Sequence, residues 1–215
     1  MTTAILGVGN IGKAVARHLV NGGERVILAE RNQSHAEAYA KDLGKLASAA
    51  PISKAIADAD VVVLAVWFDT IKELIAEHAD LLKGKVVVDP SNPIKPGADG
   101  KFVRTLPEGR SAGAVIAGLL PAGAHYVKAF GSLAADSLAS SANRAPRRAV
   151  LFYATDDERA AAAIERLIAV AGFDAMKVGG VKDVLRIEVF GDLHQFGGLD
   201  GKVLDVNEAR AAART

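Results

Sequence analysis

Short apolar runs alternate along the chain with segments in which apolar residues recur every three or four positions. The runs are typical of strands buried on both faces of a parallel sheet, and the spaced pattern is typical of amphipathic helices. The strands are expected over 3–6, 25–30, 46–48, 59–67, 85–89 and 126–129. The helices are expected over 10–21, 34–43, 52–57, 70–82 and 112–120, with a Pro/Gly-rich loop over 90–109. This alternation predicts an α/β fold with a doubly wound parallel sheet of the Rossmann type.

The pattern becomes less regular after residue 131. A strand is expected in "RRAVLFYAT", a helix over 157–171, another strand in "FDAMKVG" and a short helix in "EARAAART", with a glycine-rich stretch between the last two. We therefore predict a dinucleotide-binding domain over residues 1–131 and a small C-terminal α/β lobe over 132–215 that closes over the site. Because so small a lobe buries little of its own apolar surface, we also predict a homodimer.

Composition narrows the class of function. The net charge of 26 − 25 = +1 gives no field that would draw the chain to nucleic acid or to a membrane. The absence of cysteine excludes thiolate metal sites and thiol catalysis, and the five histidines lack metal-ligand spacing. No targeting segment and no apolar stretch of the ~20 residues that span a membrane is evident. We expect a soluble cytoplasmic protein that acts on a small molecule, without a metal.

The stretch "GVGNIG", Gly7 to Gly12, fits the pattern G-x-G-x-x-G between a strand and a helix. Gly7 permits the tight turn, Gly9 lets the backbone approach a pyrophosphate, and Gly12 lets the helix pack on the strand. The N–H groups that open the helix are free to bind phosphate. In this context the motif predicts dinucleotide binding.

The stretch "VILAERNQ" bears on which dinucleotide is bound. Glu30 stands 18 residues after Gly12, at the strand end that faces the adenosine ribose, and Arg31 follows it. A carboxylate there selects the free 2′-hydroxyl of NAD, whereas an arginine selects the 2′-phosphate of NADP. The residues alone leave both cofactors open.

With these residues identified, the chain resembles the NADPH-dependent coenzyme F-420 reductases (F-420:NADP oxidoreductases) from Ile5 to about Glu188. The resemblance rests on "GVGNIG", "VVVLAV" followed by an aromatic residue, "VVVDPSNP", "LLPAGAHYVKAF" and "AGFDAMKVGGV". It implies NADP(H) along the strand ends and a flavin or deazaflavin, such as coenzyme F-420, over the nicotinamide.

The resemblance also implies a set of cofactor-binding positions. Gly7, Gly9, Asn10 and Ile11 would line the pyrophosphate, and Arg31 matches the family's arginine for the 2′-phosphate. The remaining positions lie nearer the nicotinamide and are Val66, Trp67, Asn92, Pro93 and Phe130.

Three positions depart from the family's usual pattern. Glu30 replaces a small polar residue, so NAD stays an alternative to NADP. Gly131-Ser132 replaces Asn-Thr after the sixth strand, which changes the hydrogen-bond donors beside the nicotinamide. The tail "FGDLHQFGGLDGK" replaces an apolar helix, so the acceptor can differ from that of the family.

Other polar residues carry weaker expectations. Ser132 is a candidate to donate to the nicotinamide or the acceptor, or to cap a helix. Lys128 is expected at an exposed strand end, with phosphate binding as its alternative. His194 is a candidate substrate contact in the glycine-rich tail. The run of Arg144, Arg147 and Arg148 is expected to be a solvated edge, or else to attract a phosphorylated acceptor.

No pair of residues with acid–base chemistry stands out. Hydride transfer between a nicotinamide and a flavin-type ring needs mainly positioning, whereas reduction of a carbonyl needs a proton donor beside it. We therefore expect an NAD(P)-dependent oxidoreductase that reduces a flavin-type acceptor. The alternatives are a reductase of a small carbonyl or imine substrate and a non-catalytic redox sensor that binds NAD(P).

Overall fold

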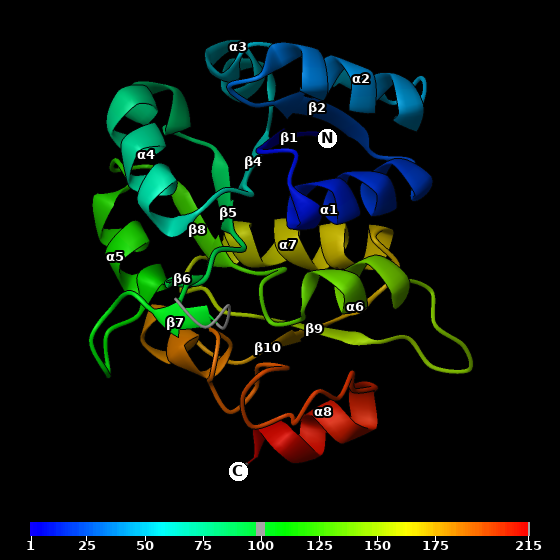
Figure 1. The fold of residues 1–215 in the computed structure, drawn as a ribbon, viewed down its shortest axis with the longest axis vertical. Coiled ribbons are helices and arrows are strands. Elements are labelled where there is room, and N and C mark those ends of the chain that lie inside the picture. Colours follow the sequence, from blue (N-terminus) through cyan, green and yellow to red (C-terminus); the bar gives the residue numbers. More distant parts are fainter. Residues whose placement is uncertain (98–101, 215) are drawn as a thin grey trace.

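A six-stranded parallel sheet forms the centre of the molecule (Figure 1). The computed structural model describes residues 1–97 and 102–214. The sheet order is β3-β2-β1-β4-β5-β8, which is the doubly wound order whose direction reverses between β1 and β4. The strands are β1 (Thr2–Leu6), β2 (Arg25–Ala29), β3 (Ala47–Ala49), β4 (Val61–Leu64), β5 (Val86–Asp89) and β8 (His125–Lys128). The predicted fold class is confirmed.

The apolar runs are explained by burial on both faces of the sheet. In β4, Val61 and Val63 belong to one hydrophobic core, while Val62 and Leu64 belong to the core on the opposite face. All four side chains are buried. Because successive side chains of a strand point to opposite faces, a strand covered by helices on both sides must be apolar at every position.

Helices cover both faces of the sheet. The residues of α1, α2, α6 and α7 contribute to one core, and those of α3, α4 and α5 to the other. The first group is α1 (Asn10–Asn21), α2 (Gln33–Leu43), α6 (Ala135–Ser140) and α7 (Glu158–Val170). The second group is α3 (Ile52–Asp58), α4 (Phe68–Leu82) and α5 (Ala112–Leu119).

The C-terminal lobe is built around the parallel pair β9 (Val150–Tyr153) and β10 (Asp174–Lys177). Helix α7 lies between this pair and the main sheet, so the cores on the two sides of α7 are continuous (Figure 1). The other face of β9 packs on the 3-10 helix η1 (Val181–Arg186) and on α8 (Val206–Ala213). Helix α8 confirms the helix expected at the end of the chain.

Several elements differ from those expected. The predicted loop over 90–109 contains two three-residue strands, β6 (Ile94–Pro96) and β7 (Phe102–Arg104), which pair antiparallel. Strands this short show no periodicity in the sequence. The fourth strand ends at Leu64, and Trp67 instead precedes α4.

Helices in the described part of the chain are too short to cross a bilayer. The longest, α4, has 15 residues, whereas a span needs ~20 apolar ones.

Candidate functional site

A cleft of about 540 Å³ lies at the carboxyl ends of the parallel strands. The segments that follow β1, β2, β4, β5 and β8 all line it, together with Val189, His194 and Phe196 of the C-terminal tail. In doubly wound sheets ligands bind at this edge, beside the point where the strand order reverses. The cleft is therefore the candidate functional site.

Two of the three glycines of the first loop are required by close contacts. Gly7 has a φ of 100°, and a Cβ there would lie 2.4 Å from the carbonyl oxygen of Ala65. A Cβ on Gly12 would lie 2.0 Å from the carbonyl oxygen of Gly7, so close packing of α1 on the loop requires glycine. Around Gly9, in contrast, there is open space within 4 Å. The loop thus leaves room for a ligand at its middle glycine.

The N-terminus of α1 is available to an anion. Gly9 caps the helix without any side-chain hydrogen bond, and the first turn holds no acidic residue. The first N–H groups of a helix have no partner within it and carry the positive end of the helix dipole. Asn10 and Ile11 open the helix and line the cleft. These features fit the pyrophosphate of a dinucleotide.

At the end of β2, Glu30 is engaged within the protein and Arg31 is open. One carboxylate oxygen of Glu30 accepts a hydrogen bond from the N–H of Val8 at 3.2 Å, and the other pairs with Nδ1 of His35. The Arg31 side chain is 81% exposed and makes an ion pair of 2.9 Å with Glu73 on α4. Exposed pairs contribute only about 0–1 kcal/mol, so a ligand phosphate can displace Glu73 at little cost.

Val66 and Trp67 line the middle of the cleft, after β4. Trp67 is 57% exposed, so it forms a wall of the cleft and is not a core anchor.

Asn92 also lines the cleft, but both ends of its side-chain amide are hydrogen-bonded within the protein. Its Nδ2 donates to the carbonyl oxygen of Gly131 at 3.0 Å, and its Oδ1 accepts from the N–H of Val189 at 2.7 Å. The side chain thereby ties together three segments of the cleft wall. Pro93 is buried and lies outside the cleft lining.

Phe130 differs most from its expected position. Its side chain is fully buried in the core, so it does not approach the cleft as the resemblance implied. Gly131, Leu133 and Ala134 line the cleft instead. Ser132 is buried outside the lining, and its hydroxyl has no hydrogen-bond partner among the described residues.

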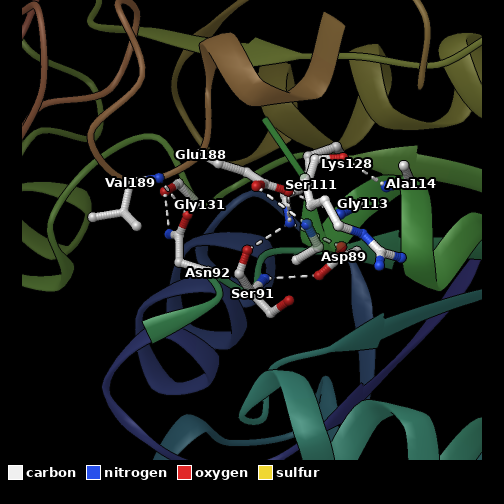
Figure 2. Close-up of polar contacts among 12 residues, drawn as sticks. Asp89, Ser91, Asn92, Ser111, Gly113, Ala114, Lys128, Gly131, Glu188 and Val189 are labelled. Carbon is white, nitrogen blue, oxygen red and sulfur yellow. Dashed lines mark hydrogen bonds and ion pairs between the residues drawn. The ribbon is translucent and has the colours of Figure 1, made fainter. Parts of the chain in front are cut away.

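A buried cluster of charges contacts Ser91, which lines the cleft (Figure 2). Lys128, expected to be exposed, is 1% exposed, which corrects that prediction. Its Nζ lies 2.9 Å from Oδ2 of Asp89, 2.5 Å from the carbonyl oxygen of Ser91 and 3.6 Å from Oε1 of Glu188. Asp89 and Lys128 are register partners on β5 and β8, so the sheet itself brings the pair together.

Glu188 connects the cluster to α5 and to the C-terminal lobe. Its two carboxylate oxygens accept the N–H groups of Ala112 and Gly113, which open α5, at 3.2 and 2.8 Å. Tyr126 donates to Asp89 at 3.0 Å. Burial first, and then the Asp89 carboxylate, raise the pKa of the Tyr126 phenol well above its usual range, so it stays protonated.

His194 lines the cleft from the C-terminal tail, and its contact with substrate stays a prediction. Its Nδ1 accepts the N–H of Phe196 at 3.0 Å, and the ring also hydrogen-bonds the backbone of Gly131. Burial, with a smaller contribution from Lys128, lowers the pKa of His194 to about 4. The ring is therefore neutral near pH 7.

The basic run does not reach the cleft. Arg144 donates to the carbonyl oxygen of Val203 at 2.8 Å, and Arg147 pairs with Asp205 at 3.0 Å. These contacts join the run to the start of α8. Among residues 1–97 and 102–214, no three His, Asp or Glu side chains are grouped to hold a metal ion.

Residues 2–93 match the family model for "NADP oxidoreductase coenzyme F420-dependent". Residues 2–93 carry the domain of this family. The resemblance expected from the sequence is thus confirmed, and with it the prediction of an NAD(P)-dependent oxidoreductase, because the family is NADP-dependent.

Solved structures share the fold over most of the chain. A hypothetical protein from Sinorhizobium meliloti is 29% identical with a TM-score of 0.82, and the match covers 95% of each chain. A proposed F420-dependent NADP reductase from Arthrobacter sp. FB24 is 24% identical with a TM-score of 0.72, over 83% of this chain and 85% of that one. A reductive aminase from Aspergillus terreus, solved with NADPH and ethyl levulinate, is 22% identical with a TM-score of 0.61. The match covers 85% of this chain and 56% of the aminase.

Several lining residues were not singled out from the sequence. Val189 and Phe196 come from the tail, and Phe102 comes from β7. In the sequence of the tail, only the glycines indicated a special role. The buried charge cluster had a clearer sequence signal, because Asp89 and Lys128 are opposite charges at matching ends of two neighbouring strands.

Replacing Lys128 with methionine tests the charge cluster. We expect Lys128→Met to lower the free energy of unfolding by about 3–5 kcal/mol, because two buried carboxylates lose their cation. Urea unfolding at pH 7 measures the loss. The matched control is Lys54→Met, which removes an exposed pair with Asp58 and should cost about 0–1 kcal/mol. Equal losses in the two variants would contradict the assignment.

The low pKa of His194 predicts a pH dependence of stability. Between pH 6.5 and about 4 the unfolded chain binds a proton at this ring that the folded chain does not, so stability falls as pH falls through that window. The free energy of unfolding lost through this ring reaches roughly 3 kcal/mol below pH 4. In urea unfolding, wild type should lose stability more steeply than His194→Asn across the window. A constant difference between the two would contradict the shift.

Proposed function

We propose that the protein transfers a hydride between NADP(H) and a flavin-type ring bound in the same cleft. The observation that carries the proposal is the continuity of the cleft. It runs from the glycine loop at Gly9, past Gly131, to aromatic residues of β7 and the tail. A dinucleotide laid on the glycine loop would have room beyond its nicotinamide for a second ring system.

The adenosine end supports NADP in preference to NAD. The Glu30 carboxylate, which would select the 2′-hydroxyl, is already engaged by Val8 and His35. The Arg31 guanidinium is exposed beside it and is held only by an exposed pair with Glu73. An arginine in this position can bind a phosphate with two parallel hydrogen bonds.

The nicotinamide end supports a reaction that depends on positioning. Asn92 and Gly131 fix the cleft wall through their mutual hydrogen bond. Ser91 also lines the cleft, and its carbonyl oxygen is held by Lys128. NADPH supplies a hydride from C4, water supplies the proton that completes reduction of the acceptor, and NADP⁺ remains.

The alternatives fit the cleft less well. Reduction of a small carbonyl or imine needs a proton donor. His194 is the candidate in the acceptor part of the cleft, but it is neutral near pH 7 and both of its nitrogens are engaged. A redox sensor would need no open space beyond the nicotinamide, whereas the cleft continues into the C-terminal lobe.

Initial rates of NADPH and NADH oxidation with flavin-type rings test the proposal. We expect NADPH to be preferred, and Arg31→Ala to raise KM for NADPH by roughly 10–100-fold, since a charge-assisted hydrogen bond contributes about 1.5–3 kcal/mol. KM for NADH should change little. Glu73→Ala is the control, because it removes the partner of Arg31 without removing the guanidinium.

Two outcomes would count against this function. Turnover with imines or ketones but with no ring acceptor would favour the carbonyl or imine reductase. Tight NADPH binding without turnover on any acceptor would favour the redox sensor.

A further inference from the structure

Three exposed aromatic side chains line the cleft. Trp67, Phe102 and Phe196 are 57%, 48% and 55% exposed, and they come from the start of α4, from β7 and from the tail. Single exposed apolar side chains are common, but several that line one cleft are typical of a ligand-binding site. A fourth exposed aromatic residue, Phe190, lies outside the cleft lining.

The charged lining residues of the cleft lie at its adenosine end. They are Glu30 and Arg31, at the end of β2. The described lining residues of the acceptor part are apolar or uncharged, and its polar members are Ser91, Asn92 and the neutral His194. A flat ring can bind there by stacking, with few polar contacts to orient it.

Two cations contact lining residues of the acceptor part, and both are already paired. Lys128 is buried and bound to Asp89. Arg104 donates to the carbonyl oxygens of Arg110 and Val189 at 2.5 and 3.5 Å, and lies 3.9 Å from Glu188.

The remaining described cation of β6 and β7 is Lys95, and it points away from the cleft. Side chains alternate along a strand, so Lys95 and its register partner Val103 lie on the face of the β6–β7 pair opposite to Ile94 and Phe102. Ile94 and Phe102 are the ones that line the cleft. Among the described residues that line the acceptor part, an anionic group would thus find no cation.

We propose that the acceptor is an uncharged polycyclic ring without a phosphate or carboxylate tail, which stacks against Trp67, Phe102 and Phe196. Riboflavin represents this class, in preference to flavin mononucleotide or coenzyme F-420. A phosphate taken into this part of the cleft loses hydration without gaining an ion pair or a charged donor. The inference rests on the proposed function and narrows its substrate.

The reaction is balanced for this acceptor. The C4–H bond of NADPH breaks, and its electron pair and hydrogen form an N–H bond at N5 of the oxidised ring. A proton from water completes the reduction at N1. The products are NADP⁺ and dihydroriboflavin.

Riboflavin and flavin mononucleotide form a matched pair of probes, because they share one ring and differ by the phosphate. We expect kcat/KM for NADPH oxidation to be roughly tenfold higher with riboflavin. Quenching of flavin fluorescence on titration into the NADP⁺-saturated protein should show the same order of affinity. Equal or tighter binding of flavin mononucleotide, or its faster reduction, would overturn the inference.

The binding measurement separates this inference from the proposed function. Preferential binding of riboflavin without turnover would support the acceptor site but contradict the reductase. Turnover with flavin mononucleotide or coenzyme F-420 as the preferred acceptor would support the reductase but contradict the uncharged acceptor.

Variants locate the ring. Phe196→Ala should weaken riboflavin binding by roughly tenfold, since the bound ring loses one stacking partner. Phe190→Ala, at a similarly exposed phenylalanine outside the cleft, is the control and should leave binding unchanged. Equal effects of the two substitutions would overturn the placement.

A second pair of variants tests the role of charge. Phe102→Lys places a cation in the cleft and should raise the ratio of flavin mononucleotide to riboflavin affinity by roughly tenfold. Val103→Lys places the same charge on the opposite face of β7 and should not change that ratio. An unchanged ratio in Phe102→Lys, with native unfolding behaviour, would contradict the proposed orientation.

Discussion

Lys128 lies between the carboxylates of Asp89 and Glu188 in the interior, and the shape of the cleft depends on this arrangement. Three charges are costly to bury unless each finds a partner. Asp89 and Lys128 meet because β5 and β8 are in register, and Glu188 completes the cluster while binding the first N–H groups of α5. Glu188 therefore fixes the start of the tail, and Val189 beside it is held by Asn92.

The local parts of the site could be predicted from the sequence. The glycines of the first loop lie as expected, because the positive φ of Gly7 and the contact of Gly12 with Gly7 are local to the loop. The buried strands were evident because a strand covered on both faces must be apolar throughout. The position of Glu30 at the end of β2 follows from the same regular alternation.

The parts that depend on distant contacts could not be predicted. Phe130 is turned into the core, and Lys128 is buried by a carboxylate 60 positions further along the chain. The Asn92 amide binds Gly131 and Val189, so a position that the resemblance assigned to the cofactor is a structural link of the cleft wall. The irregular tail lacks periodicity, yet it supplies His194 and Phe196 to the cleft. As a result the cleft is charged at the end of β2, where Glu30 and Arg31 lie, and uncharged beside β7 and the tail.

Transfer of deuterium tests the central claim most directly. NADPH labelled with deuterium at one face of C4 would be incubated with the protein and 5-deazariboflavin, whose reduced C5 retains a transferred hydrogen. Mass spectrometry of the reduced ring should find one deuterium from one of the two labelled faces and none from the other. Oxidation of the label without deuterium in the ring, or tight binding without any transfer, would contradict direct hydride transfer within the cleft.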